Sequence, residues 1–396
     1  METVHVILIV LPFILLLFTA ERTLLYFARK RIPLVIEVNG TRGKSTVTRM
    51  LHELLRRTGR KVFAKTSGSA AMFLFPDGSE KPVRRIGPAN VREQRNMLVK
   101  SAFLKADAIV VECSAVKPEL QLVSSRYLRP DITVVTNVRE DHAEEQGNAE
   151  QRAASFAGAV PEGGVLIITD SRFDSVWERA ARQNNLRLIS FPAAAALCKE
   201  GGIPYEFPEN AAAVFALAEY LRLDRALAYG AIKEYHADCG AFGCYFRKTG
   251  RNRAGFIDAR AANDVESTQK IFVPCMRRLQ GMMKAPRRIL LVVNREDRPD
   301  RTRAFTRYAL DNAGSFDMFL FLGHRPCSLR KAVKALPSAF INNMDDLERI
   351  INTEPERDCI VAAAGNYGGK GKLLTMWLAK KKNEPGFVRL TGIELL

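Results

Sequence analysis

Three observations predict an α/β protein with two folded units behind an apolar N-terminal segment. From residue 34 onwards, short apolar runs typical of buried strands alternate with helical patterns, which favours a mainly parallel sheet covered on both faces. A second alternation begins at Arg288, after a break at 284–286, and indicates a smaller Rossmann-like unit. The segment 3–20 is apolar almost throughout. We therefore expect the units to be 1–31, 32–286 and 287–396.

The expected strands are short, apolar and often β-branched. In the larger unit they are 34–38, 62–65, 108–112, 132–136, 165–169 and 186–190, and in the smaller unit 289–293, 318–322 and 359–364. The expected helices include the alanine-rich segment 210–223 and the later segments 301–312, 328–335, 345–352 and 370–382.

The composition excludes several classes of protein. The seven cysteines are scattered without a C-x-x-C pair and only five histidines are present, so buried free thiols fit better than a zinc site or a disulfide framework. The net charge of +17 favours a polyanionic substrate or an anionic lipid surface. No zinc finger, helix-turn-helix or aromatic-interleaved basic patch supports binding to nucleic acid.

The segment 3–20 reaches about the minimum length of a membrane-spanning helix. Pro12 is tolerable there, and the basic residues between 22 and 31 place the rest of the chain in the cytoplasm by the positive-inside rule. A cleaved signal peptide is the alternative, but Met1-Glu2 offers no basic n-region. We expect a single-pass anchor in the cell membrane, with 23–28 continuing as an interfacial helix.

The most informative motif lies between the apolar run 34–38 and an amphipathic helix that we expect to end near Gly59. A strand, a glycine turn, a Lys-Ser pair and a helix N-terminus together form a phosphate cradle, because backbone N–H groups and the helix dipole point at the anion. Lys44 can reach the outer phosphates, and the Ser45 hydroxyl can hold Mg²⁺. The motif predicts ATP bound by Gly40, Thr41, Arg42, Gly43, Lys44, Ser45 and Thr46.

Val38 replaces the first glycine of a standard Walker A motif. The shorter Gly-Thr-x-Gly-Lys-Ser/Thr form resembles the P-loop of the Mur ligase superfamily, whose members use ATP to make amide bonds through acyl phosphates. That resemblance implies a Mur-ligase-like ATP-binding domain in 32–286. Further stretches that resemble the superfamily follow in order as far as Asn263.

Glu112 ends the expected strand 108–112, at the edge where ligands of open α/β sheets bind, so it is a candidate Mg²⁺ ligand. A capping or salt-bridged glutamate is the alternative. The stretch 136–142 resembles the superfamily's Thr-Asn-x-x-x-Asp-His segment. The resemblance implies that His142 is a second metal ligand and that Asn137 belongs to the nucleotide site, and Asp141 is placed to orient the imidazole.

Asn210 resembles the asparagine with which the superfamily meets adenine, although a plain helix cap would also explain it. Asp258 resembles the aspartate of the loop that closes on ATP, where it would touch ribose or phosphate-bound water; an Asx-turn is the alternative. Arg295 and Arg298 follow the first strand of the smaller unit and are candidate γ-phosphate ligands, unless they belong to a charged exposed loop.

Two departures from the superfamily leave roles open. Many Mur ligases carry a carbamylated lysine shortly after the histidine, whereas no lysine stands between 118 and 198 here. The Gly-Arg that often precedes the strand of Asp258 is replaced by Gly240-Ala241. Arg247 or Arg295 would have to fill that place.

A membrane segment directly before this P-loop is closer to the ligase subunits of poly-γ-glutamate synthetases, the CapB/PgsB type, than to other branches. Residues 1–33 leave no room for the UDP-sugar domain of peptidoglycan Mur ligases, and folylpolyglutamate synthetases lack the membrane segment. Stretches similar to the CapB/PgsB type are 87–94, 111–119, 136–142 and 294–301.

The resemblance implies an ATP- and Mg²⁺-dependent ligase that polymerises glutamate through a γ-carboxyl acyl phosphate. It implies glutamate and the growing poly-γ-glutamate chain as ligands and small membrane subunits as partners. Three alternatives stay open: a membrane-linked P-loop ATPase that drives transport, a small-molecule kinase, and an assembly subunit without turnover.

Overall fold

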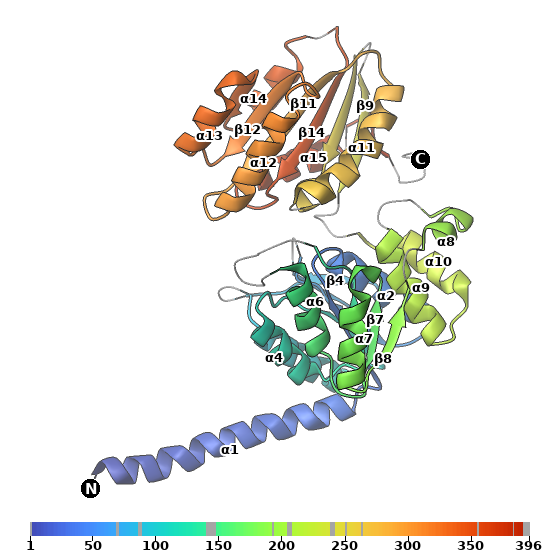
Figure 1. Ribbon diagram of the computed structural model, residues 1–396, viewed down its shortest axis with the longest axis vertical. Helices are drawn as coiled ribbons and strands as arrows, with labels where there is room; N and C mark the ends of the chain where they lie inside the picture. Colours follow the sequence, from blue (N-terminus) through green and yellow to red (C-terminus); the bar gives the residue numbers. More distant parts are fainter. Residues whose placement is uncertain are drawn as a thin grey trace. The chain divides into compact units, whose positions relative to one another are not determined.

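The computed structural model in Figure 1 divides into two compact units, Met1–Leu197 with Phe207–Ala237 and Cys198–Glu206 with Asp238–Leu396. The residues that the structure describes are 2–68, 71–85, 89–139, 148–191, 194–203, 208–237, 242–249, 252–262, 264–354, 356–382 and 384–390. Each unit contains one sheet with helices packed on it, as the alternation of strands and helices predicts.

The first unit contains an eight-stranded sheet in the order β4-β3-β2-β5-β1-β6-β7-β8. Six of its strands are parallel: β1 (Leu34–Asn39), β2 (Val62–Lys65), β5 (Ala108–Glu112), β6 (Ile132–Val135), β7 (Val165–Ile168) and β8 (Arg187–Ser190). The antiparallel strands β3 (Met72–Leu74) and β4 (Glu80–Pro82) extend one edge. All six predicted strands of this unit are confirmed.

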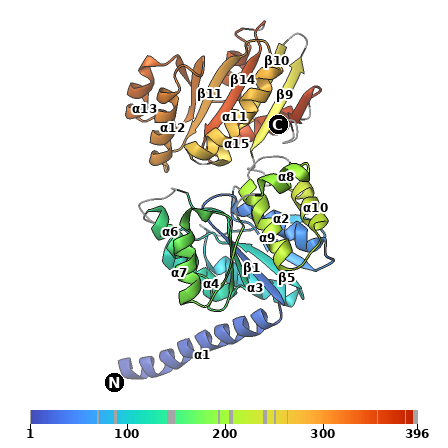
Figure 2. The same cartoon turned by 45° about the vertical axis from the view of Figure 1, so that its right-hand side comes forward.

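Two groups of helices cover this sheet. One group contains α2 (Lys44–Arg56), α9 (Pro208–Tyr220) and α10 (Arg225–Glu234), which pack against one another. The other contains α3 (Arg92–Phe103), α4 (Pro118–Leu128), α6 (Ala149–Gly158) and α7 (Asp174–Gln183), and these pack in series (Figure 2). The short helix α8 (Ala195–Glu200) follows β8.

Helix α1 (Glu2–Lys30) is one continuous helix that includes Pro12. Its segment Val10–Lys30 is long and apolar enough to cross a membrane. Large apolar side chains between Val10 and Phe18 are exposed, whereas Ala28 is buried in the core of the first unit. The last turns are also held by ion pairs, Glu21–Arg95 at 2.6 Å and Arg29–Asp131 at 2.5 Å. Only the first part of α1 is therefore free to enter a bilayer without leaving the folded unit.

The second unit contains a seven-stranded sheet in the order β13-β12-β11-β14-β10-β9-β15. Its strands are β9 (Gly243–Thr249), β10 (Asn252–Asp258), β11 (Arg287–Asn294), β12 (Met318–Gly323), β13 (Ser338–Ile341), β14 (Cys359–Gly365) and β15 (Phe387–Leu390). Its helices are α11 (Val265–Gly281), α12 (Pro299–Asp311), α13 (Cys327–Ala332), α14 (Met344–Ile351) and α15 (Gly371–Lys381). The three strands predicted for the smaller unit are confirmed as β11, β12 and β14.

The structure corrects the predicted boundary between 286 and 287, because this boundary falls inside the second unit. Strand β10 pairs in parallel with β14, with Ala254 opposite Cys359. Phe256 packs edge-on against Trp377 at 5.0 Å between ring centroids, within one core. The segment 284–286 is only the turn between α11 and β11, and a sequence run that reads as a strand does not reveal which sheet the strand joins.

The six described cysteines are free, and all of them except Cys327 are buried. This confirms the expected buried thiols. Cys239 lies outside the described residues.

Candidate nucleotide-binding site

The P-loop joins β1 to α2 through two glycines in left-handed backbone conformations. Gly40 has φ 120° and Gly43 has φ 77°. A Cβ atom on Gly40 would collide with Thr136, and one on Gly43 would collide with Asn210. Both positions therefore need glycine for backbone and for space. The predicted order of strand, glycine turn and helix is confirmed, with α2 beginning at Lys44.

The segment after β6 holds the loop in place. The N–H of Thr41 donates to the carbonyl of Asn137 at 2.9 Å, and the N–H of Arg42 donates to the Asn137 side-chain oxygen at 2.9 Å. The Asn137 amide returns a bond to the Arg42 carbonyl at 3.1 Å. Asn137 thus holds the backbone of the P-loop in place. This is a positioning role within the predicted nucleotide site.

The N-terminus of α2 has no side-chain cap among the described residues. The N–H groups of Lys44, Ser45 and Thr46 form its first turn, and such groups are the ones that a bound anion satisfies. The Lys44 ammonium donates to the carbonyls of Gly40 at 2.7 Å and Thr41 at 3.3 Å, so it lies over the loop. This end of the helix combines positive charge with a shaped glycine turn, which suits the phosphates of a nucleotide.

Glu112, the last residue of β5, is buried and faces the start of α2. Its Oε2 atom accepts hydrogen bonds from the Ser45 hydroxyl at 2.9 Å and from the Ser67 N–H at 2.6 Å. Glu112 forms no ion pair with any described residue, and this disfavours the alternative that it is a salt-bridged glutamate. A carboxylate and a hydroxyl side by side are hard oxygen donors of the kind that Mg²⁺ prefers. These two residues fit the expected ion.

His142 and Asp141 lie outside the described residues. No cluster of three His, Cys, Asp or Glu side chains is found among the residues that are described. The role of His142 as a metal ligand therefore stays a prediction.

Asn210 lies against the P-loop at Gly43. Helix α9 begins at Pro208, so Asn210 sits inside its first turn, and the cap alternative does not hold. The residue is 6% exposed, and its side-chain carbonyl oxygen, which adjoins Gly43, has no hydrogen-bond partner among the described residues. A buried unsatisfied polar atom needs an explanation, and the edge of a nucleotide base would supply the missing partner.

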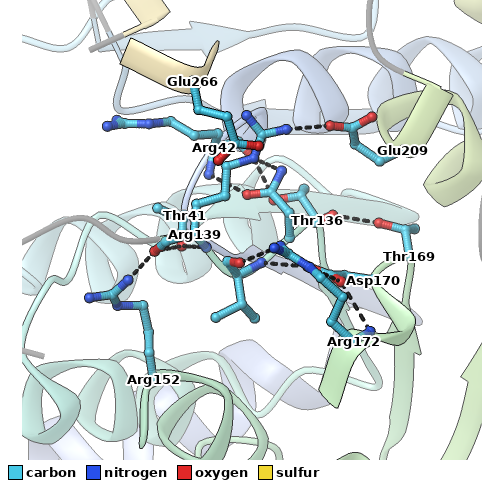
Figure 3. Close-up of polar contacts among 12 residues, drawn as sticks. Thr41, Arg42, Thr136, Arg139, Arg152, Thr169, Asp170, Arg172, Glu209 and Glu266 are labelled. Atoms are coloured by element: carbon cyan, nitrogen blue, oxygen red, sulfur yellow. Dashed lines mark hydrogen bonds and ion pairs between the residues drawn. The ribbon is translucent and has the colours of Figure 1, made fainter. Parts of the chain in front are cut away.

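A buried arginine that the sequence analysis missed connects these elements (Figure 3). The Arg139 N–H donates to the Thr41 hydroxyl at 3.1 Å, and its guanidinium pairs with Glu209 at 2.6 Å. The fully buried Arg152 donates to the Arg139 carbonyl. The signal that could have found Arg139 is its place in the segment that follows β6, a strand that ends at the P-loop edge.

Asp170 closes the far side of this network. It accepts the N–H of Val138 at 3.2 Å and pairs with Arg172 at 2.7 Å, and Arg172 also reaches the Val138 carbonyl. Burial alone would raise the pKa of Asp170, but the bonds from Arg172 and Val138 outweigh burial and lower it. The carboxylate therefore stays charged and holds the segment after β6.

Glu37 lies in β1, just before the loop. It accepts a hydrogen bond from the Ser124 hydroxyl at 2.5 Å, and burial raises its pKa to about 7 against the opposing effects of Ser124 and Cys113. Burial likewise raises the pKa of Cys113 to about 12. The strand that leads into the loop thus contains a carboxyl group that keeps its proton to a higher pH than an ordinary glutamate.

The remaining predicted site residues belong to the second unit. Asp258 accepts two bonds from the buried Arg260 guanidinium at 2.7 Å, and the Arg260 N–H closes the Asx-turn at 3.3 Å. Arg295 is paired with Asp297 at 2.5 Å, and Arg298 occupies the N-cap position of α12. Arg247, the suggested substitute, lies 3.7 Å from Glu384. The contacts of Asp258, Arg295 and Arg298 with nucleotide therefore stay predictions.

Two protein-family models match the chain. The model described as the Mur ligase middle domain covers residues 38–216, and the poly-gamma-glutamate synthase CapB C-terminal domain covers 245–381. The first match contains the P-loop, Glu112 and Asn210.

Curated relatives decide the family. The PGA synthase CapB of Bacillus subtilis (strain 168) is 30% identical over 298 residues, which cover 73% of this chain and 74% of that protein. The chain belongs to the CapB family. The capsule biosynthesis protein CapB of Bacillus anthracis is 30% identical over 295 residues, or 70% of this chain, and the match spans 61% of the longer relative.

Solved structures support the fold of this CapB family member. FolC of E. coli, solved in complex with ADP, has a TM-score of 0.61 at 16% identity, and the match covers 92% of this chain and 94% of that chain. The predicted Mur-ligase-like α/β fold is thereby confirmed.

Proposed function

We propose that the chain is an ATP-dependent acid–amino-acid ligase that polymerises glutamate into poly-γ-glutamate. The observation that carries the proposal is the uncapped helix N-terminus with Lys44, Ser45 and Glu112, in a chain of the CapB family. A phosphate cradle beside an oxygen-donor pair supports phosphoryl transfer. Membership of the CapB family points to glutamate as the acceptor of the phosphoryl group.

A free carboxylate does not condense with an amine in water. ATP with Mg²⁺ supplies the phosphoryl group that turns the γ-carboxylate of glutamate into an acyl phosphate, from which an incoming amine displaces phosphate. The chain contributes charge and position: Lys44 and the N–H groups of α2 neutralise the phosphates, and Ser45 with Glu112 would hold Mg²⁺. Asn210 would receive the base, and His142 would complete the metal ligands.

Asp258, Arg295 and Arg298 of the second unit would close on the nucleotide during the reaction. We place them in the same proposal because their sequence context resembles the superfamily, and a second domain that closes over phosphates is a common way to exclude water. We assign no residue of this chain to the role that the carbamylated lysine has in many Mur ligases.

Glutamate and the growing polymer would be the ligands, and the net charge of +17 suits a polyanionic product. Helix α1 would anchor the chain in the cell membrane, next to small membrane subunits. Deleting residues 1–20 is expected to release a folded enzyme, because the turns from Glu21 onwards belong to the first unit. Retention of the shortened chain in the membrane pellet would refute the anchor.

The decisive assay incubates membranes that contain the chain with ATP, Mg²⁺ and labelled glutamate. We expect ADP and a γ-linked labelled polymer, with Lys44→Ala as the inactive control. ADP formation without glutamate dependence would instead favour a membrane-linked transport ATPase, and phosphorylated product without polymer would favour a small-molecule kinase.

A further inference from the structure

A closed ring of contacts links the two ends of the candidate nucleotide site. It runs from Thr41 in the P-loop to Arg139 and from the Arg139 guanidinium to Glu209 (Figure 3). Asn210 follows Glu209 in the chain. Asn210 returns to the loop at Gly43, where no Cβ atom would fit between them. The ring therefore joins the segment after β6 to the first turn of α9.

The Arg139–Glu209 ion pair is the only part of this ring, among the described contacts, in which two charges face each other. The two atoms are 2.6 Å apart, and the side chains are 5% and 22% exposed. A buried guanidinium that already has a carboxylate partner is held in place rather than offered to solvent. The backbone of Arg139 is fixed as well, by Thr41 and by the buried Arg152.

We propose that Arg139 and Glu209 are positioning residues that set the distance between the phosphate end and the base end of the nucleotide site. The inference rests on the proposed ATP site and deepens it. The phosphates would lie on the N–H groups of α2, while the base would meet Asn210 on α9, and the pair fixes α9 against the loop.

This role makes a prediction that separates it from direct phosphate binding. Inorganic tripolyphosphate carries the charges of ATP without the base and the ribose. If the pair only positions α9, then loosening it weakens the binding of ATP and leaves tripolyphosphate unaffected. If Arg139 touches a phosphate, both ligands lose affinity together.

The experiment measures the affinity of the full chain in detergent for ATP and for tripolyphosphate by calorimetry, each with Mg²⁺. Glu209→Gln is expected to weaken ATP on the order of tenfold, as is typical when a supporting partner is removed, while tripolyphosphate stays within about twofold. The exchanged pair Arg139→Glu with Glu209→Arg should recover part of the ATP affinity.

Glu234→Gln is the matched control. Glu234 pairs with Arg57 at 2.5 Å, between α10 and the end of α2, and it has no described contact with the P-loop. It should change neither affinity. Equal losses for ATP and tripolyphosphate in Glu209→Gln, or no loss of ATP, would overturn the inference. A wild-type chain that binds neither ligand would refute the nucleotide site itself.

Discussion

In each sheet, the carboxyl ends of the parallel strands lie along one edge. The polar groups at these two edges differ in which hydrogen-bond and ion-pair partners they have. At the edge of the first sheet, the segments after β1, β5 and β6 bond to one another: Asn137 holds the P-loop, and Ser45 donates to Glu112. At the edge of the second sheet, both amide atoms of the buried Asn294 have no described partner, and Arg295 is neutralised by Asp297.

This difference shows where the chain is preorganised. The first edge presents an ordered cation and uncapped helix N–H groups, so a ligand finds the interactions already in place. The second edge keeps its guanidinium occupied by a neighbouring carboxylate. Substitutions at the first edge should therefore cost more than matched substitutions at the second.

The largest expected effect is the loss of Lys44. Lys44→Ala should lower the rate of polymer formation on the order of 10²–10³, because it removes the charge that lies over the loop. Arg295→Ala should lower the rate on the order of tenfold, since Asp297 already neutralises that side chain. The measurement is initial ADP release in the presence of glutamate.

Lys233 on α10 is exposed and provides the control for a lost surface cation, with no expected effect on the rate. A larger loss for Arg295→Ala than for Lys44→Ala would reverse the comparison between the two edges.

The pair Ser45 and Glu112 tests whether one ion is shared at the first edge. Glu112→Gln should lower the rate on the order of a hundredfold and raise the Mg²⁺ concentration needed for half-activity. Ser45→Ala should act in the same direction. The double variant should lose less than the product of the single losses, because both side chains face one place. Independent losses with unchanged Mg²⁺ dependence would argue against a shared ion.

Two glycines with nearly equal backbone angles measure how closely the first edge is packed. Gly43 has φ 77° and would place a Cβ against Asn210, whereas Gly59 has φ 79° and no described atom lies within 4 Å of a Cβ there. Gly59→Ala should cost about 1–2 kcal/mol of unfolding free energy, from backbone strain alone. Gly43→Ala should cost more and also weaken ATP binding.

Adding Asn210→Ala to Gly43→Ala removes the collision and should recover part of the lost stability. Chemical denaturation of these three variants and the wild type gives the comparison. Equal costs at Gly43 and Gly59 would mean that the loop and α9 are not in contact.

The last comparison concerns one strand from the interior of each sheet. The first sheet has Glu37 in β1, whereas the interior strand β11 of the second sheet is apolar from Ile289 to Val293. Burial raises the pKa of Glu37 from 4.5 to about 7. Below pH 4.5 both the folded and the unfolded states hold the proton. As the pH rises to about 7, only the unfolded state ionises, so the free energy of unfolding falls.

Glu37→Gln should remove that slope and gain up to about 3 kcal/mol above neutral pH, before any loss from the altered bond to Ser124. Urea unfolding between pH 4.5 and pH 8 measures it. Parallel curves for the variant and the wild type would show that Glu37 titrates normally.

The strands that were predicted could be recognised because each is a short apolar run bounded by a turn, whereas β3, β4, β9, β13 and β15 were not predicted. The P-loop was predictable for a physical reason as well, since two left-handed glycines followed by Lys44 and Ser45 have few other uses. By contrast, nothing in the run of β10 indicates that it pairs with β14, which lies far along the chain. The domain boundary was wrong for that reason.

The candidate site was only partly predictable for a related reason. Glu112 stood out because it ends a strand, but the Arg139–Glu209 pair joins residues that are distant in sequence. Asn210 was open to two explanations until the helix start at Pro208 was known. Long-range pairs of buried charges have no local pattern, so they emerge only from the folded structure.

Helix α1 continues without a break into the core of the first unit, with Ala28 buried and Arg29 paired to Asp131. A helix joined in this way would pass its own rotation on to the folded unit, whereas a helix joined by a flexible linker would not. Hydrophobic helices change their tilt when the thickness of the bilayer changes. In a membrane, such a change of tilt would turn the whole sheet and move the P-loop with it. Ligase rates compared in short-chain and long-chain lipid would reveal that mechanical coupling, and equal rates would rule it out.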